Sequence, residues 1–416
     1  MKILVLNSGS SSQKACLYEI GEPLPDDPSV CLWEGKLEWN GRATTVKPAD
    51  GNIERDDASV SSRKKALEHL LGTLCNNNGA GGASVSGIDV VGHRIVHGGP
   101  QFEQPVLVTR EVKAAIAGTA AFAPLHTEAA LEGLEVIEAL LGPVPQIAVF
   151  DTGYHQNMPI AAAVYPGPYE WLERGIRRYG FHGINHQYCA TRAARLLGRD
   201  VKSLKVVTCH LGNGCSLAAT DGGRSIDTTM GFTPLDGLMM GTRSGSVDPG
   251  VLTYLMRHDH LQGQDIDNVL NKNSGLLGVS GLSSDMRDIL VAINQGHPRA
   301  RLAFDVYVHR LRSGIGAMVA VLGGIDALVF TAGAGENSPE LRAAACEQLG
   351  FLGLKLDRKA NAQPSLDQDI AAGESQVRVL VVRAQEDWAI ARECWKLARV
   401  LADWSDTAEP AGTFRS

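Results

Sequence analysis

The spacing of apolar residues along the chain predicts short buried strands that alternate with helices. Apolar runs typical of strands occur at residues 3–6, 15–20, 88–96, 145–150, 206–209 and 327–330. Apolar positions recur at helical spacing in residues 61–75, 127–141, 186–197, 299–322 and 387–401. The polar segments 50–62 and 361–374 are expected to form loops. Strands and helices mixed in this way predict α/β lobes whose functional groups lie at strand ends.

The order strand, glycine turn, strand occurs twice, in residues 3–20 and again in residues 205–217. Two such units about half a chain apart suggest a duplicated domain. Glycine hairpins are common, so two copies alone leave two unrelated hairpins as an alternative.

Length and composition restrict the class of protein. A chain of 416 residues exceeds what one core normally supports, so two lobes are expected. The net charge of -7 argues against nucleic acid as a partner but is compatible with a small anionic substrate. The eight cysteines include no pair at CxxC spacing, which disfavours a zinc site and, in so long a chain, a disulfide framework.

The most apolar long stretch, residues 314–335, is interrupted by two consecutive glycines. It is interpreted as the end of a buried helix followed by a buried strand, rather than as a membrane span. The apolar run at residues 3–6 is too short for the core of a signal peptide. We therefore expect a cytoplasmic protein without a membrane partner.

Three turns rich in glycine or serine each follow an apolar strand, at residues 7–12, 212–214 and 333–337. Glycine lets backbone N–H groups approach a phosphate closely, and Lys14 adds an ammonium group after the first turn. None of the turns is a Walker motif or a GxGxxG motif, and each alone could be a simple hairpin turn. Three in one chain favour a nucleotide site.

Charged side chains also fall where loops are expected. Arg94 and Arg243 lie near glycines, where an anion contact is favoured, although a lone arginine is more often a surface charge. Asp151 follows a strand, a position suited to metal or proton chemistry or to a turn cap. His182 precedes a predicted helix and is interpreted as a donor to a charged transition state, whereas His186 is interpreted as structural.

Together these motifs resemble the acetate kinase family, part of the acetate and sugar kinase/Hsp70/actin superfamily. The resemblance covers nearly the whole chain, and the combination of motifs is highly specific. The motifs are Asn7-Ser8-Gly9-Ser10-Ser11-Ser12, His93-Arg94-Ile95-Val96-His97-Gly98-Gly99, Val149-Phe150-Asp151-Thr152, Tyr179-Gly180-Phe181-His182-Gly183, His210-Leu211-Gly212-Asn213-Gly214, Met239-Met240-Gly241-Thr242-Arg243-Ser244-Gly245 and Gly335-Glu336-Asn337-Ser338-Pro339.

The resemblance implies a duplicated actin-like, ribonuclease H-like fold of two lobes, with the active site in the interdomain cleft. Residues 1–151 and 387–403 would form the N-terminal lobe on the acyl-substrate side. Residues 152–386 would form the nucleotide-binding lobe, and residues 404–416 a frayed tail. The resemblance also implies a homodimer.

The implied reaction is reversible, direct in-line transfer of the γ-phosphoryl group of ATP to acetate, which gives acetyl phosphate and ADP. Because the acceptor is already an anion, no strong base is needed, and the barrier comes from bringing anions together in line. Asn7 and Glu386 would hold Mg²⁺, or Mn²⁺ in its place, through water. The residues implied to act in catalysis are Asp151, His182 and Arg243. Those implied to bind the acyl substrate are Arg94, Val96, Leu125, Phe181 and Pro234. Those implied to bind ATP are Lys14, His210, Leu211, Gly212, Asn213, Gly214, Asp285, Met286, Arg287, Gly333, Ala334, Gly335, Glu336 and Asn337.

Six positions depart from the family's pattern. Thr127-Glu128 stands where Asn-Pro is usual, and Ser246 stands where Asp is usual. Gln385-Glu386-Asp387 replaces an Asn-Glu-Glu motif, and Ala334 replaces a larger aliphatic residue. These changes bear on acceptor fit and on the adenine pocket, and none removes a charged catalytic residue. Two alternatives stay open: a propionate kinase of the same fold, and an actin- or Hsp70-like ATP-binding module without transferase activity.

Overall fold

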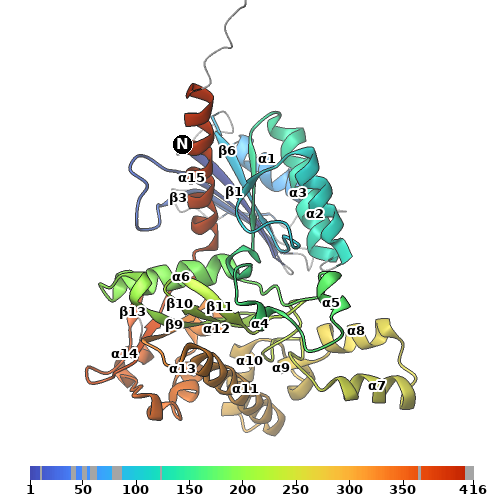
Figure 1. The fold of residues 1–416 in the computed structure, drawn as a ribbon, viewed down its shortest axis with the longest axis vertical. Helices are drawn as coiled ribbons and strands as arrows, with labels where there is room; N and C mark the ends of the chain where they lie inside the picture. The colour runs from blue at the N-terminus through green and yellow to red at the C-terminus, as the bar shows by residue number, and fades with distance from the viewer. Residues whose placement is uncertain are drawn as a thin grey trace, which may run out of the picture. The chain divides into compact units, whose positions relative to one another are not determined.

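The computed structural model describes residues 1–9, 12–38, 44–48, 54–56, 63–76, 87–121, 124–363 and 367–407 of the 416 (Figure 1). The chain forms two compact units, one of residues 1–153 with 385–416 and the other of residues 154–384. Each unit is built around its own sheet, and each is described separately below.

The first unit contains an eight-stranded sheet in the order β5-β4-β3-β2-β1-β6-β8-β7. Strands β1, β6 and β8 are parallel, whereas β2 pairs antiparallel with β1, and β3 pairs antiparallel with β2. The strands are β1 (Lys2–Ser8), β2 (Ser12–Glu19), β3 (Cys31–Glu38), β4 (Thr44–Pro48), β5 (Glu54–Asp56), β6 (Val90–Ile95), β7 (Val106–Leu107) and β8 (Gln146–Phe150).

Helices cover both faces of the centre of this sheet. The helices of the unit are α1 (Arg63–Asn76), α2 (Arg110–Gly118), η1 (Thr119–Ala121), α3 (Pro124–Leu141), η2 (Gly153–His155, at the boundary between the units) and α15 (Glu386–Thr407). Both α3 and α15 pack against β1 and β6. Gly92 of β6 faces Cys394 of α15, and the next residue, His93, lies toward Gly133 of α3, so the two helices occupy opposite faces.

The second unit contains a six-stranded sheet in the order β11-β10-β9-β12-β14-β13. Strands β9, β12 and β14 are parallel, and β10 and β11 run antiparallel beside β9. The strands are β9 (Lys205–Leu211), β10 (Cys215–Asp221), β11 (Arg224–Thr228), β12 (Ala327–Thr331), β13 (Gln368–Asp369) and β14 (Arg378–Val381).

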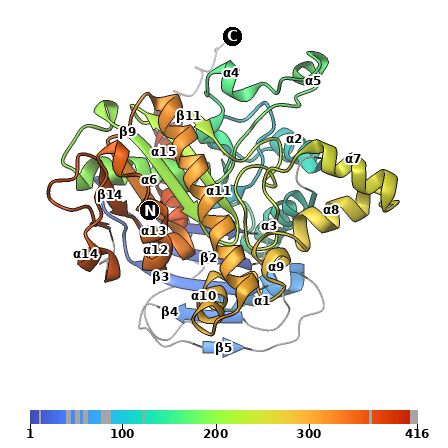
Figure 2. The ribbon, with the colours of Figure 1, turned by 90° about the horizontal axis from the view of Figure 1, so that it is seen from below.

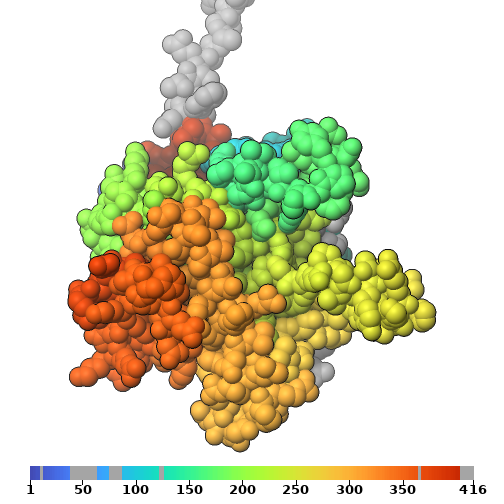
Figure 3. Space-filling model, turned by 60° about the horizontal axis from the view of Figure 1, so that its bottom comes forward, coloured from blue at the N-terminus to red at the C-terminus, as the bar shows by residue number. Residues whose placement is uncertain are grey.

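Helices also lie on both sides of the second sheet, with α6 on one side and α11 on the other (Figure 1). The helices are α4 (Ile160–Ala163), α5 (Glu170–Glu173), α6 (Gly183–Leu196), η3 (Val201–Ser203), α7 (Pro249–His258), α8 (Gly263–Lys272), α9 (Gly275–Ser280), α10 (Met286–Asn294), α11 (Pro298–Leu322), α12 (Ala332–Asn337), α13 (Pro339–Cys346), η4 (Gly350–Leu352) and α14 (Arg358–Ala362). Helices α7 and α8 form an arm that projects from the unit (Figures 2 and 3).

The two sheets share one topology. In each, three antiparallel strands (β3-β2-β1 and β11-β10-β9) continue into two parallel strands (β6-β8 and β12-β14). Five strands with the same order and direction in both halves confirm the duplicated α/β fold expected from the sequence. No helix in the described ranges combines the length and the apolar character needed to cross a membrane.

Some local predictions were wrong. Residues 333–337, expected to form a glycine turn, belong to helix α12, where the Glu336 carboxylate accepts from the backbone N–H of Ala332 (2.8 Å). The segment 50–62 includes the short strand β5, and residues 361–374 include β13. Helix α15 continues to Thr407, beyond the predicted start of the tail at residue 404, and residues 408–416 lie outside the described residues.

A close approach between β6 and α15 generates a stability prediction. A Cβ atom at Gly92 would lie 2.5 Å from Cys394 Sγ and 2.9 Å from Ile390 Cγ2. We expect Gly92→Ala to lower the free energy of unfolding in urea by about 1–3 kcal/mol, and Cys394→Ala to restore part of the loss. The control is Gly72→Ala on α1, where nothing lies within 4 Å of the new atom. If Gly92→Ala and Gly72→Ala had the same free energy of unfolding, the close packing at Gly92 would be contradicted.

Candidate active site

Asn7 joins the first strand of the chain to the start of its last helix. The Asn7 amide Nδ2 donates to Glu386 Oε2 (3.1 Å) and to Asp387 Oδ1 (2.9 Å). Glu386 is 379 residues away in the chain. The structure therefore brings together the two residues that the resemblance assigns to the metal, and it adds Asp387 beside them.

Lys14 lies opposite Asn7 in the pairing of β1 with β2. Its ammonium Nζ is 2.8 Å from Asp387 Oδ2 and 3.5 Å from Glu34 Oε2. Burial opposes the charge of Lys14, but Asp387, together with Cys16 and Glu34, more than offsets this effect, and the pKa of Lys14 is raised. The side chain is therefore held as an ammonium ion.

A buried ion pair links Arg94, near the end of β6, to Asp151, which follows β8. Arg94 Nη2 lies 2.7 Å from Asp151 Oδ2, and the two side chains are 10% and 1% exposed. The parallel pairing of β6 with β8, and the bond from Asp151 N to Ile95 O (2.8 Å), fix their mutual position. Burial opposes the charge of Arg94, but Asp151 and Glu386 together raise its pKa. Within the described residues, the buried Nε of Arg94 has no hydrogen-bond partner.

The carboxylates of this group outnumber its cations. The carboxylates are those of Asp151, Glu386 and Asp387, and the cations are those of Lys14 and Arg94. Burial raises the pKa of Glu386, with Arg94 opposing the shift, as expected for a carboxylate whose charge is incompletely balanced. Oxygen ligands with spare negative charge suit Mg²⁺, which usually keeps several water molecules. The described ranges contain no group of three or more His, Cys, Asp or Glu side chains that could hold a metal directly.

His182 occupies an unusual backbone position at the start of α6. Its φ of 56° and ψ of 23° lie in the left-handed region, which is uncommon for any residue other than glycine. The ring stacks on His210, with 3.9 Å between centroids and 7° between planes. Its Nδ1 is 2.8 Å from Ser216 Oγ. The ring is thus held by contacts to two strands of the second sheet.

The Ser216 hydroxyl lies between His182 and a second histidine. Ser216 Oγ is 2.7 Å from His186 Nε2, and His186 Nδ1 contacts Thr208 Oγ1. Burial lowers the pKa of His186 well below its usual value, so this ring is neutral. His186 therefore acts as an interior partner of the Ser216 hydroxyl, with no exposure of its own.

The turn at residues 212–214 lies beside His182 and Arg243, the two side chains of this unit that the resemblance assigns to catalysis. A Cβ atom at Gly214 would be 3.4 Å from the His182 ring and 3.6 Å from Arg243 Nη1. Arg243 Nη1 donates to Pro234 O (3.2 Å), and in the described part of the chain Arg243 forms no ion pair. Burial lowers the pKa of Arg243, although a guanidinium remains charged. A buried cation without a counter-ion beside a glycine turn is suited to an anion.

The other residues that the resemblance assigns to ATP binding differ in their burial and in the hydrogen bonds that they already form. The Glu336 carboxylate accepts from the backbone of Ala332 and Ala384, and Asn337 Nδ2 donates to Gly333 O (2.8 Å). Leu211 and Met286 are buried, whereas the Arg287 side chain is 87% exposed and pairs with Asp285.

The residues assigned to the acyl pocket come from both units. Val96, which follows β6, is buried in the first unit, and Phe181 is buried in the second. Pro234 belongs to the segment between β11 and α7, where its carbonyl oxygen accepts from Arg243. Leu125 is in the first turn of α3, but its side chain lies outside the described residues.

Sequence reasoning assigned no role to Asp387, Ser216 or Arg178. Asp387 contacts Asn7, Ser216 contacts His182, and Arg178 binds the backbone of the segment that leads to Pro234 and Arg243. Asp387 could have been found from its position next to Glu386. Ser216 and Arg178 carry no such signal, because each acts through neighbours that only the fold supplies.

The structure combines two units of one topology with a set of carboxylates suited to Mg²⁺. It also has a glycine turn beside an arginine that forms no ion pair within the described residues. These features are those of a phosphotransferase. Comparison with known proteins gives the family. The model of the acetokinase family matches residues 2–392. An acetate kinase from Trichormus variabilis is 58% identical over 406 residues, with 95% of this chain and 99% of the relative covered. One from Gloeobacter violaceus is 56% identical over 405 residues, with 96% of this chain and 100% of the relative covered.

Solved structures agree with the sequence comparison. The acetate kinase of Porphyromonas gingivalis has a TM-score of 0.86 and 41% identity, with 95% of this chain and 99% of that chain covered. A propionate kinase from Francisella tularensis has the same TM-score and 36% identity, with 94% and 98% covered. The chain belongs to the acetokinase family. It is therefore an ATP-dependent kinase, and the alternative of an ATP-binding module without transferase activity is removed.

Proposed function

We propose that this chain transfers the γ-phosphoryl group of ATP to acetate, reversibly, to give acetyl phosphate and ADP. The observation that carries the proposal is the buried pair of Arg94 and Asp151. The Arg94 guanidinium keeps a donor, Nε, that has no partner within the described residues, and a guanidinium suits a small carboxylate. An acetate oxygen forms a bond to the γ-phosphorus while the bond from that phosphorus to the β,γ-bridging oxygen of ATP breaks. Acetate is already ionised, so no proton has to be removed.

The proposed role of Arg94 is to hold the acetate carboxylate, with Asp151 as the catalytic carboxylate that fixes the guanidinium. Asp151 occupies Nη2 of Arg94, and Nη1 makes only long contacts to Asn7 Oδ1 (3.4 Å) and Ser8 O (3.5 Å), so a substrate would be bound by Nε and Nη1. Val96, Leu125, Phe181 and Pro234 are proposed to surround the methyl group.

Arg243 and His182 are proposed to oppose the negative charge that spreads over the phosphoryl group during transfer. The support is their shared position beside Gly214 and the absence of an ion pair at Arg243 within the described residues. A donor that is held in place before the reaction contributes most where charge develops, and therefore stabilises the transition state more than the bound substrates.

Asn7 and Glu386 are proposed to hold Mg²⁺ through water, with Asp387 beside them. The metal, when bound, would offset the charge of the ATP phosphates. Lys14 is proposed to lie near those phosphates. The nucleotide itself is proposed to contact residues 210–214, 285–287 and 333–337, the last of these mainly through backbone groups, because Glu336 and Asn337 already bond within their own unit.

The choice of acceptor is the direct test of the proposed function. Similarity to a propionate kinase makes propionate the second candidate. We expect purified protein to form acetyl phosphate from ATP and acetate, with kcat/KM for acetate at least about tenfold above that for propionate, since one methylene is worth about 1–3 kcal/mol. Val96→Ala should narrow this ratio. A higher kcat/KM for propionate would overturn acetate as the substrate while leaving the reaction class intact.

The metal role predicts a specific defect in Glu386→Gln. Loss of the charge should raise the Mg²⁺ concentration needed for half-maximal rate and weaken Mn²⁺ binding measured without turnover. Because its pKa is raised, wild-type Glu386 binds a proton more readily than a free glutamate, so the Mg²⁺ requirement should rise as the pH falls. In Glu386→Gln, which cannot bind this proton, the part of the pH dependence that comes from Glu386 should be absent. Glu393→Gln, on the same helix, removes an exposed carboxylate that pairs with Lys396 and serves as the control. Unchanged metal binding in Glu386→Gln would remove the residue from the site.

The transition-state role predicts a separation of kcat from KM. Arg243→Ala and His182→Ala should each lower kcat by about ten- to a thousandfold, the scale of losing one fixed donor, and change the KM values far less. Asp151→Asn should be at least as damaging. Aluminium fluoride with ADP and acetate, a mimic of the transferring phosphoryl group, should inhibit the wild type strongly and Arg243→Ala weakly. A near-normal kcat in Arg243→Ala would exclude direct transfer supported by Arg243.

A further inference from the structure

The segment that carries Pro234 and Arg243 connects β11 to α7 as residues 229–248 and includes neither strand nor helix. Isolated backbone hydrogen bonds hold it close to Arg243, such as Ser244 N to Leu270 O (3.0 Å) and Ser274 N to Thr242 O (3.0 Å). Its first part, which contains Pro234, is held mainly by side chains. A small displacement there would move the carbonyl oxygen to which Arg243 donates.

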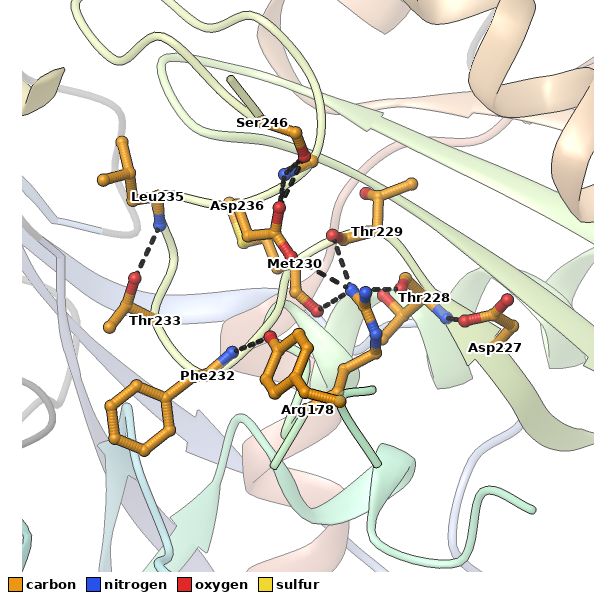
Figure 4. A network of polar contacts seen from close by, with 12 residues as sticks. Arg178, Asp227, Thr228, Thr229, Met230, Phe232, Thr233, Leu235, Asp236 and Ser246 are labelled. Atoms are coloured by element: carbon orange, nitrogen blue, oxygen red, sulfur yellow. Dashed lines mark hydrogen bonds and ion pairs between the residues drawn. The ribbon is translucent and has the colours of Figure 1, made fainter. Parts of the chain in front are cut away.

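Arg178 binds the start of this segment. Its Nη1 donates to three successive carbonyl oxygens, those of Thr228 (3.0 Å), Thr229 (2.8 Å) and Met230 (3.0 Å), which converge on the guanidinium in Figure 4. The guanidinium carbon also lies 5.7 Å from the centre of the Tyr165 ring. Arg178 thus fixes the point at which the chain leaves β11.

A second set of bonds closes the segment on itself. Asp236 Oδ2 lies 3.5 Å from Arg178 Nη1, and Asp236 Oδ1 accepts from Ser246 Oγ (Figure 4). The backbone N–H of Gly237 donates to both Asp236 Oδ1 and Ser246 Oγ, each at 2.9 Å. Ser246 lies three residues beyond Arg243. These contacts therefore join Asp236 and Gly237, which precede Arg243 in the chain, to Ser246, which follows it.

Arg178 also belongs to the segment that leads to His182. The next two backbone N–H groups, of Tyr179 and Gly180, donate to Gly231 O at 3.1 and 3.3 Å. A Cβ atom at Gly231 would lie 2.2 Å from the Tyr165 hydroxyl oxygen and 2.5 Å from Asp236 Oδ2, so the packing leaves no space for a side chain. The chain segment that precedes His182 and the segment that precedes Arg243 are therefore bonded to each other around Arg178.

We propose that Arg178 is a positioning residue for phosphoryl transfer. It fixes residues 228–246 so that the Pro234 carbonyl holds Arg243, and it does so without contact to Arg243 itself. The inference rests on the proposed function of Arg243 and extends it to a residue outside the reacting groups.

The first test is Arg178→Ala. We expect kcat to fall about tenfold or more, because small misplacements of catalytic groups are costly, with each KM changed less than about threefold. Added guanidinium ion, at concentrations that leave the variant folded, should occupy the vacated site and restore part of kcat. Methylammonium, which lacks the planar fork, should restore less. A wild-type kcat in Arg178→Ala, or no rescue, would overturn the proposal.

The matched control is Arg378→Ala in the same unit. Arg378 also collects loop carbonyls, those of Ala372 (3.1 Å) and Ser375 (3.3 Å), and pairs with Asp369. Its side chain is 28% exposed, close to the 21% of Arg178. A purely structural role for Arg178 predicts the same kinetics for both variants. The positioning role predicts that Arg378→Ala loses stability while its folded fraction keeps wild-type kcat.

The second test is a double-mutant cycle with Arg243→Ala. If Arg178 acts through Arg243, its removal should change kcat by less than about twofold once Arg243 is absent. Independent, multiplying effects would overturn the inference and leave the role of Arg243 intact. A near-normal kcat in Arg243→Ala alone would instead overturn the proposed function and the inference with it. Should Arg178→Ala fail to fold, the same cycle is run with Arg178→Gln, which keeps one donor and most of the volume.

Discussion

The ion pair between Arg94 and Asp151 is the constraint on which the first unit depends. Two charges that are almost fully removed from water are tolerated only when each has its partner, and removing either would leave the other buried and unpaired. The pair requires β6 and β8 to be parallel neighbours, because only then do the two strand ends meet. The pair also acts electrostatically on Glu386 at the start of the last helix, where Arg94 lowers the pKa of the carboxyl group and Asp151 raises it. The amide of Asn7 and the ammonium of Lys14 then fix the start of that helix against β1 and β2. The two ends of the chain are therefore held in one unit by charge as well as by packing.

The candidate site of the second unit has the opposite excess of charge from that of the first unit. Its candidate groups are a glycine turn, a neutral interior histidine and a buried arginine without a counter-ion in the described residues. An excess of carboxylate in the first unit suits a cation, and an uncompensated guanidinium in the second suits an anion. Transfer of a phosphoryl group between two anions needs both kinds of site. One topology, present twice, thus carries two different electrostatic environments, because the loops that follow equivalent strands carry different side chains.

More of the fold than of the candidate site could be predicted from the sequence. Apolar runs located the strands, and the repeated order of strand, turn and strand indicated the duplication, because both signals are local in sequence. Residues 333–337 were misjudged because glycine permits a turn but does not require one, and the Glu336 carboxylate caps a helix there. The closeness of Asn7 to Glu386 could be expected only from the family resemblance, since nothing local links residues so far apart in the chain. Ser216 and Arg178 could not be found at all: a serine in a strand and an arginine in a loop are ordinary until the fold supplies their partners.

His182 shows how the surroundings maintain a strained residue. A left-handed backbone at a residue other than glycine costs on the order of 1–3 kcal/mol and persists only where neighbouring contacts determine it. Here the ring is stacked on His210 and bonded to Ser216, whose hydroxyl is also in contact with His186. Before it, Gly180 takes the positive φ that the chain needs to reach this position, and the backbone of that stretch is bonded to Gly231. The same stretch begins at Arg178, which also holds the segment that leads to Arg243. The strain at His182 and the placement of Arg243 are thus sustained by one set of polar contacts, so the two side chains beside Gly214 are not positioned independently.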